Sequence, residues 1–452
     1  MARPNISMHG QWSSRLAFVL AATGSAVGLG NIWKFPYITG ENGGGAFVLV
    51  YLACIALMGL PIMMAEVMLG RRGRQSPINT MRSLAREEGA SPVWRYMGWL
   101  GVVAGFLILS YYSVIAGWAL AYGFRTAAGV FTGATADGVN SIFSRLVSDP
   151  ERLLAWHTVF MVMTMVVVSR GVQSGLERAV RFLMPSLFVL LVLLVGYAMS
   201  QGAFLSGLQF LFTPDFSKLS GQAVLLAMGQ AFFTLSLGMG AIMMYGSYLP
   251  SGTSIARTSI TVAGADTAVA ILAGLAIFPI VFANGLEPGA GPGLIFKTLP
   301  IAFGHMPGGV IFGTAFFLLL VFAAWTSAIS IIEPFVAYLV ENRGMTRVQA
   351  AAWAGLGTWV VGIGTVLSFN VWSQPWAFGK TFFDLIDYLT SNILLPLGGL
   401  LIALFAGWLM SKRSVRDELG LEAGWFAVWL LVLRYVAPVA VLIVFLNAVG
   451  LI

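Results

Sequence analysis

The sequence has little charge and almost no cysteine for its length. Only 10% of its 452 residues are charged, whereas 58% are hydrophobic and the mean hydropathy is +0.86. A soluble protein of this size could not bury that much apolar surface. The single cysteine, Cys54, excludes an intrachain disulfide, and the three scattered histidines match no Cys/His metal motif. The chain is therefore expected to be an all-α polytopic membrane protein.

Acidic residues are outnumbered, with 18 Asp and Glu against 25 Lys and Arg, for a formal net charge of +7. The basic residues gather in short loops between apolar runs, which the positive-inside rule explains better than a nucleic-acid partner does. We therefore expect a multi-pass protein of the cell's inner (plasma) membrane, in contact with the lipid bilayer and without nucleic acid. Its N-terminus would be cytoplasmic.

Hydropathy predicts about eleven transmembrane helices, because each run approaches or exceeds the length needed to cross a bilayer. They are residues 15–37, 44–70, 96–124, 154–169, 182–200, 221–249, 258–284, 309–340, 348–369, 380–410 and 424–450. An odd number of spans places the C-terminus outside. The predicted organisation is a cytoplasmic N-terminus (1–14), a first repeat (15–200), an extracellular loop (201–220), a second repeat (221–411), and a cytoplasmic loop with helix 11 (412–452).

Two of these spans are weakest as helices in their middle. The first contains the run GSAVGLG at 24–30, and the sixth contains Ser236, Gly238 and Gly240. The two spans lie five apart, so halves of opposite orientation would bring their breaks together, as in inverted-repeat transporters. Close helix packing through small residues is the alternative for either run alone. Two breaks at matching positions favour two five-helix inverted repeats with unwound helices 1 and 6, plus one extra helix.

Unwinding a helix inside a bilayer frees backbone groups that must find partners. Carbonyl groups suit a small cation, and the N–H ends of half-helices suit a carboxylate, so one broken pair can bind sodium and an amino acid together. Polar side chains near the breaks could complete such a site: Asn31, Thr234, Ser236, Thr326, Ser327 and the intramembrane Asp266. For the hydroxyl groups, a bond back to a carbonyl one turn earlier is the alternative. For Asp266 the alternative is a protonated or snorkelling acid.

Four stretches of the chain resemble the neurotransmitter:sodium symporter family. They are GSAVGLGNIWKFPY (24–37), ENGGGAF (41–47), GQAFFTLSLGMG (229–240) and AAWTSAIS (323–330). The resemblance covers essentially the whole chain and looks closest to bacterial members that transport hydrophobic amino acids. It implies the leucine-transporter fold and a sodium-coupled symporter that imports hydrophobic or aromatic L-amino acids by alternating access, not an enzyme.

The resemblance also implies two sodium sites and no chloride. The first site would use Ala26, Asn31, Thr234 and Asp266, and the second would use Gly24, Val27, Ala323, Thr326 and Ser327. In chloride-dependent relatives the position of Asp266 is usually Asn, with a nearby Ser that is Ala270 here. The fixed carboxylate would supply the negative charge that chloride supplies in those relatives.

The substrate pocket implied by the resemblance is apolar. Its lining would be Ser25, Ala26, Leu29, Gly30, Ile108, Tyr112, Phe233, Thr234, Ser236, Met239, Ser327 and Ile331. The Tyr112 hydroxyl would bind the substrate carboxylate. Gly28 stands where monoamine transporters carry an Asp, so the substrate should keep its carboxylate. Met239, which is flexible, should leave room for bulky side chains.

Two gates and one brace complete the implied mechanism. Lys34 and Asp387 would form the outer gate, with Asp384 as a rival partner for the lysine. The inner gate would use Trp12 and Glu341, with His9 standing where the family has Arg or Lys, so inward opening could depend on cytoplasmic pH. The brace would be Glu66, which holds the broken sixth span. Ile402 stands where some relatives have a second such acid, and Arg434 would bind a carbonyl or a lipid phosphate.

Other functions of the same fold remain open at this point. The alternatives are a sodium-coupled transporter of another small carboxylate-bearing amino acid or osmolyte, and a receptor or channel that does not transport. The sequence has no HExxH, Ser–Lys or paired-acid signature of an intramembrane enzyme. It assigns no oligomeric state.

Overall fold

The computed structural model describes residues 7–288, 293–448 and 451, and the regular elements among them are all helical. Within this part of the chain, nine helical segments are long and apolar enough to cross a membrane: Gly45–Gly73, Pro92–Ala127, Pro150–Ser169, Val172–Met199, Ile255–Ala283, Gly309–Arg343, Arg347–Ser368, Phe382–Leu409 and Ala423–Asn447. The all-α membrane class predicted from hydropathy is confirmed.

Two further spans are interrupted. Helix α1 (Arg15–Ala26) and the helical segment Gly30–Glu41, which ends in α2 (Phe35–Glu41), pass the same length and hydropathy test together and are bent by 51° at the break. Helix α11 (Gly221–Thr234) is separated from the short α12 (Ala241–Ser247) by six residues. With the first broken pair counted as one span, the described residues contain up to ten candidate spans, and α11 and α12 lie where the sixth of the eleven predicted spans was expected.

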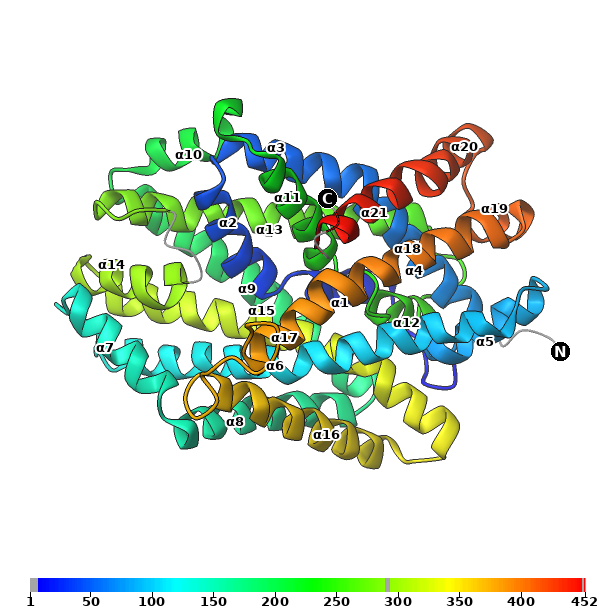
Figure 1. Cartoon of the computed structure of the whole chain (residues 1–452), viewed down its shortest axis with the longest axis horizontal. Coiled ribbons are helices and arrows are strands. Elements are labelled where there is room, and N and C mark those ends of the chain that lie inside the picture. Colours follow the sequence, from blue (N-terminus) through cyan, green and yellow to red (C-terminus); the bar gives the residue numbers. More distant parts are fainter. Residues whose placement is uncertain (1–6, 289–292, 449–450, 452) are drawn as a thin grey trace.

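Figure 1 shows the long helices running side by side across the molecule. Helices α6 (Arg95–Ala127) and α15 (Gly309–Arg343) pack against each other in the middle, and α8 (Pro150–Ser169) and α16 (Arg347–Ser368) pair along the lower edge. Helix α1 lies inside, in contact with α15, α13 (Ile255–Ala283) and α9 (Arg178–Met199). The remaining membrane helices are α3 (Gly45–Cys54), α4 (Leu60–Gly73), α17 (Phe382–Tyr388), α18 (Leu395–Leu404), α20 (Ala423–Leu431) and α21 (Ala437–Ala448).

The connections between spans hold helices that hydropathy did not predict. Helices α7 (Ala136–Val147), α10 (Phe204–Phe212) and α14 (Leu299–His305) lie at the left end of Figure 1, whereas α5 (Pro77–Glu87) and α19 (Lys412–Leu419) lie at the right end with the N-terminus. These helices are short; α7 and α19 each bury only one side, whereas the first turn of α5 is buried all round. A hydropathy average over about 19 residues misses such segments.

Arginines at the end of α4 tie the helices at the N-terminal end of the bundle together. Arg71 Nε lies 2.6 Å from Glu418 Oε1 of α19, and Arg72 Nη2 lies 2.6 Å from Glu87 Oε1 of α5. Burial, followed by the neighbouring Arg71, lowers the pKa of the Arg74 guanidinium. These basic residues are therefore packing elements as well as topological signals.

Arg434 has a protein partner. Its Nε donates to the carbonyl of Gly407, and its guanidinium lies 5.1 Å from the ring centroid of Trp408. Of the two partners predicted for this arginine, the structure shows the carbonyl. The contact joins the last span to the end of the tenth.

Candidate functional site

The first break lies where the sequence is rich in small residues. Helix α1 ends at Ala26 and helical structure resumes at Gly30, so the opening is shorter than the predicted run 24–30. The hydroxyl of Ser327, on α15, lies 3.3 Å from the Gly24 carbonyl, 3.1 Å from that of Ser25 and 3.0 Å from that of Val27. The freed carbonyls of the first span therefore converge on the eighth span.

The second break is opened by left-handed backbone. Ser236, Gly238 and Gly240 have φ of +54°, +80° and +76°, a region that strains most residues other than glycine. Glu66 Oε1 accepts a hydrogen bond of 2.6 Å from the Gly238 N–H, and the Ser236 hydroxyl donates to the Ser25 carbonyl at 2.8 Å. The first contact lies where the brace was predicted, and the second joins the two breaks directly.

The residues predicted for the second sodium site lie together. Thr326 Oγ1 is 3.0 Å from the Ala323 carbonyl oxygen, and the Ser327 hydroxyl contacts the Gly24 and Val27 carbonyls as described above. A Cβ added at Gly24 would lie 3.1 Å from Thr326 Cβ, so the two helices are in close contact here. Three carbonyls and two hydroxyls form a neutral set of hard oxygen donors, which is the donor type that small hard cations prefer.

The residues predicted for the first sodium site surround a buried carboxylate. Asp266 is 0% exposed, and its Oδ1 accepts from Asn31 Nδ2 at 2.7 Å, while Oδ2 accepts from Thr234 Oγ1 at 3.0 Å. Both partners are neutral, so these contacts leave the carboxylate's charge unbalanced. A buried charge requires a counter-charge or protonation. A cation bound beside Asp266, Asn31 and Thr234 would supply that counter-charge, and Ala26, the fourth predicted residue, lies at the end of α1.

Between the two breaks lies a narrow pocket of about 20 Å³. Its lining contains the predicted substrate residues apart from Thr234, together with Gly28: Ser25, Ala26, Leu29, Gly30, Ile108, Tyr112, Phe233, Ser236, Met239, Ser327 and Ile331. The Leu29 N–H donates to the Tyr112 hydroxyl at 3.2 Å, so both groups meet at this cavity. The Ser25 hydroxyl is buried and has no hydrogen-bond partner among the described residues.

A larger vestibule of about 400 Å³ adjoins the pocket. Leu29, Tyr112 and Phe233 line both cavities and so separate them. Lys34 and Asp387 both line the vestibule, but the structure does not join them as an ion pair. The Lys34 Nζ lies 4.6 Å from the Phe233 ring centroid instead, and Asp387 Oδ1 accepts a 3.0 Å hydrogen bond from Ser391.

The rival acid, Asp384, is engaged elsewhere. Its Oδ2 accepts from the Thr381 hydroxyl at 2.7 Å and from the Thr381 N–H at 3.2 Å, which caps α17. The structure therefore gives Asp384 a helix-capping contact in place of the predicted contact with Lys34.

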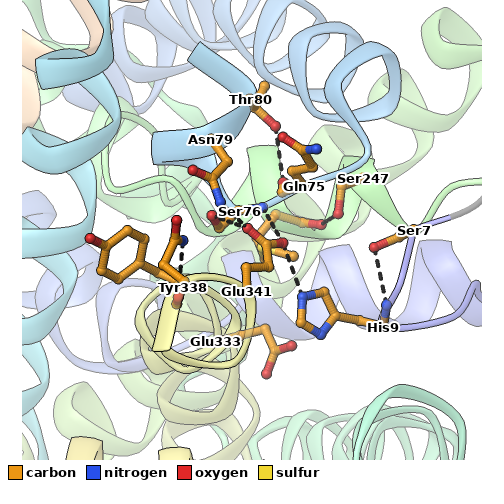
Figure 2. A network of polar contacts seen from close by, with 12 residues as sticks. Ser7, His9, Gln75, Ser76, Asn79, Thr80, Ser247, Glu333, Tyr338 and Glu341 are labelled. Atoms are coloured by element: carbon orange, nitrogen blue, oxygen red, sulfur yellow. Dashed lines mark hydrogen bonds and ion pairs between the residues drawn. The ribbon is translucent and has the colours of Figure 1, made fainter. Parts of the chain in front are cut away.

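The opposite end of the pathway is closed. Trp12 is 2% exposed, and its indole Nε1 donates to the Tyr245 carbonyl at 3.2 Å. Glu341, near the end of α15, contacts His9 Nε2 at 3.0 Å (Figure 2). With the vestibule open and this end closed, the described conformation faces the side of α7, α10 and α14.

Some contacts at the breaks involve residues that sequence reasoning did not select. Gln230 Nε2 donates to the Gly30 carbonyl at 2.8 Å, and so braces the first break. The hydroxyls of Ser236 and Ser327 also donate to carbonyls of the first break, whereas Ile402 has no polar group to offer. The signal available in the sequence was the polar Gln230 within an apolar run, one turn before Thr234.

Comparisons with known proteins agree with this geometry. The model of the sodium:neurotransmitter symporter family matches residues 9–135 and 144–451. The chain is 42% identical over 445 residues to the sodium-dependent transporter YhdH of Bacillus subtilis, covering 98% of each chain. It is 34% identical to a sodium-dependent transporter of Haemophilus influenzae, covering 96% of this chain and 97% of the other. The crystal structure of MhsT in complex with L-phenylalanine is 47% identical, with a TM-score of 0.90, covering 97% of this chain and 99% of MhsT.

Proposed function

Because the chain belongs to the sodium:neurotransmitter symporter family and is a sodium-dependent membrane transporter, not an enzyme, we propose that it imports hydrophobic and aromatic L-amino acids. Sodium would drive this uptake by alternating access. The observation that carries the proposal is the mostly apolar, uncharged lining of the pocket between the two helix breaks. The similarity to MhsT, whose structure holds L-phenylalanine, supports an aromatic substrate.

The polar end of the pocket fits an α-carboxylate. The Leu29 N–H, at the start of the half-helix that continues into Gly30–Glu41, points to the Tyr112 hydroxyl. A carboxylate placed beside both groups could accept from the N–H and from the hydroxyl, and the positive end of the half-helix dipole would favour its charge. A Cβ at Gly28 would lie 2.6 Å from Ser327 Oγ and 2.8 Å from Tyr112 OH. A side chain at Gly28 would therefore compete with the carboxylate for this space.

The other end of the pocket fits an apolar side chain. Ile108, Met239 and Ile331 are all buried, and no charged residue lines the pocket among the described residues. A charged substrate side chain would lose its hydration there without gaining a partner. Met239 has an unbranched, flexible side chain that can adapt to substrates of different shape.

Both predicted sodium sites are supported by the oxygen atoms around them. At the first, Asp266 supplies a negative charge beside Asn31 and Thr234. At the second, five neutral oxygens of α1 and α15 would hold the ion: those of Gly24, Val27, Ala323, Thr326 and Ser327. The second site connects the broken span to an unbroken one, so an ion bound there would hold α1 in position.

We propose that transport does not require chloride. The carboxylate of Asp266 already supplies a fixed negative charge beside the first sodium site, and Ala270 offers no hydroxyl to an anion. A second anion in the same buried region would repel the first. Replacing chloride by gluconate should therefore leave uptake unchanged.

Alternating access would move the two predicted repeats, residues 15–200 and 221–411, around the pocket. We place the open vestibule outside the cell and the closed end, with its basic loops, in the cytoplasm. This orientation gives a cytoplasmic N-terminus and an external C-terminus in the inner membrane.

Binding and transport can be tested separately on the purified protein. A thermal-shift scan of the L-amino acids, with and without sodium, should show stabilisation by apolar and aromatic substrates only when sodium is present. In proteoliposomes, an inward sodium gradient should drive uptake of a labelled substrate found in that scan. Stabilisation by glycine, alanine or charged amino acids alone, or uptake that ignores sodium, would contradict the proposal.

A further inference from the structure

We propose that His9 is a proton-sensitive latch on the cytoplasmic gate, a role that rests on the proposed transport function. In its protonated form it would hold the N-terminal segment to Glu341, and in its neutral form it would hold that segment more weakly. Acidification of the cytoplasm would therefore slow inward opening.

Glu341 is fixed in place without any help from His9. Its Oε1 accepts from the Ser76 N–H at 2.7 Å, and its Oε2 accepts from the Ser76 hydroxyl at 2.5 Å and from Asn79 Nδ2 at 2.7 Å. Ser76 is the residue before α5, so the carboxylate also lies at the positive end of that helix. Three donors, two from Ser76 and one from Asn79, thus hold the Glu341 carboxyl group in a fixed orientation.

Among the described residues of the N-terminal segment, which begin at Ser7, His9 is the one that contacts this carboxylate. Its Nε2 lies 3.0 Å from Glu341 Oε1, and the two side chains are only 3% and 4% exposed. Figure 2 shows the imidazole reaching Glu341 from the side opposite to Ser76 and Asn79. The segment continues to Trp12, whose indole closes over Tyr245 and Tyr248. Loss of the His9 contact would therefore weaken the packing of Trp12 against Tyr245 and Tyr248, which closes this end of the pathway.

The protonation state of the imidazole decides the strength of this contact. The imidazolium form gives an ion pair reinforced by a hydrogen bond. The neutral form donates to the carboxylate only when its proton is on Nε2, and with the proton on Nδ1 it presents a lone pair to Glu341. An arginine at this position would stay charged at every physiological pH, so the histidine makes the contact respond to protons.

The charges around His9 do not cancel this response. The His9 ring packs edge-on against Tyr248, with the ring centroids 6.1 Å apart. The Tyr248 hydroxyl donates to Glu333, which is already paired with Arg347. The ionisable groups on the surrounding elements are Glu341 and Glu333 of α15, Arg347 of α16, Tyr248 after α12, Arg74 after α4, and Glu177 and Arg181, which bond Ser13. Of these, Glu341 is the group bonded directly to the imidazole.

Cysteine labelling can measure the latch directly. Ala17 lies in α1 on the cytoplasmic side of the break and is 1% exposed, so a cysteine there should react only after inward opening. We would label Ala17→Cys in a Cys54→Ala background, in nanodiscs without sodium, at about pH 6 and about pH 8, because histidine is the side chain that commonly changes its charge in this range. Rates are normalised to an exposed Ser91→Cys reference, because thiol reactivity itself depends on pH.

The expected result is labelling about fivefold faster at the higher pH, given the difference between charged and neutral hydrogen bonds. His9→Arg should label slowly at both pH values, and His9→Gln should label fast at both. His305→Gln, which changes an exposed histidine at the far end of the bundle, should keep the wild-type dependence. Equal labelling of the wild type at both pH values, or a pH dependence that survives in His9→Gln, would overturn the proposal.

The latch and the transport function fail in different ways. The labelling needs neither a substrate nor a sodium gradient, so it reports on the gate even if no amino acid is taken up. Conversely, sodium-driven uptake that does not change with internal pH, together with pH-independent labelling, would leave the transport function standing and remove the latch.

Discussion

Replacing Gly28 by alanine tests the geometry of the pocket with a single added methyl group. Gly28 lies between the two halves of the first span, and its φ is not in the left-handed region, so alanine strains no backbone angle there. The added Cβ would lie 2.6 Å from Ser327 Oγ and 2.8 Å from Tyr112 OH. Carbon and oxygen do not approach this closely without a bond, so these side chains must move.

The expected cost follows from those two contacts. Insertion of a methyl group into a packed site costs about 1–3 kcal/mol, which corresponds to about a fivefold to 150-fold loss of affinity. Because Ser327 belongs to the proposed second sodium site and Tyr112 to the proposed carboxylate site, both half-saturation constants should rise together. Uptake kinetics and thermal shifts titrated with sodium and with substrate would measure the two values.

A matched glycine controls for the change of residue type. Gly196 lies in α9, and a Cβ added there meets nothing within 4 Å. Gly196→Ala should leave both constants unchanged, or stabilise the helix slightly by up to about 1 kcal/mol. If Gly28→Ala binds sodium and substrate as tightly as the wild type, the assignment of Tyr112 and Ser327 to these sites is refuted.

Three further substitutions address separate parts of the site. Asp266→Asn should raise the half-saturation constant for sodium by about tenfold or more, because the cation loses a charged partner. Uptake by this variant should then differ between chloride and gluconate. A variant that binds sodium as tightly as the wild type would contradict the proposed site. Glu66→Leu should leave the Gly238 N–H buried and unpaired, which should lower the free energy of unfolding by about 1–3 kcal/mol in thermal unfolding. Glu66→Gln should lower it less, because its amide oxygen can still accept this hydrogen bond. Met239→Phe should reduce affinity for tryptophan relative to leucine by about tenfold in competition assays, and an unchanged ratio would exclude Met239 from the pocket wall.

Much of the site could be predicted because it is built from the backbone. The small residues around Ala26 and Gly238 weaken two helices at matching places, and a weak helix is visible in the sequence. The family resemblance then assigned the side chains around the breaks. The structure brings together Asn31, Thr234 and Asp266, three residues that lie far apart along the chain.

The conformation of the gates could not be read in the same way. A sequence indicates that Lys34 and Asp387 have opposite charges, but it does not say which state of the transport cycle the chain adopts. In the open vestibule Lys34 lies over Phe233, and Asp384 caps its own helix. The contacts of Glu341 with Ser76 and Asn79 could not be predicted from the sequence either, because α5 is an amphipathic helix that hydropathy does not detect.

One layer of side chains separates the proposed substrate pocket from the vestibule, because Leu29, Tyr112 and Phe233 line both cavities. A substrate must pass the same three side chains on entering and on leaving toward the outside. A bulkier residue in this layer should therefore slow association and dissociation together, and change the dissociation constant less than either rate. Residence time, measured by dilution of a bound labelled amino acid, would then be a more sensitive probe of this layer than equilibrium affinity.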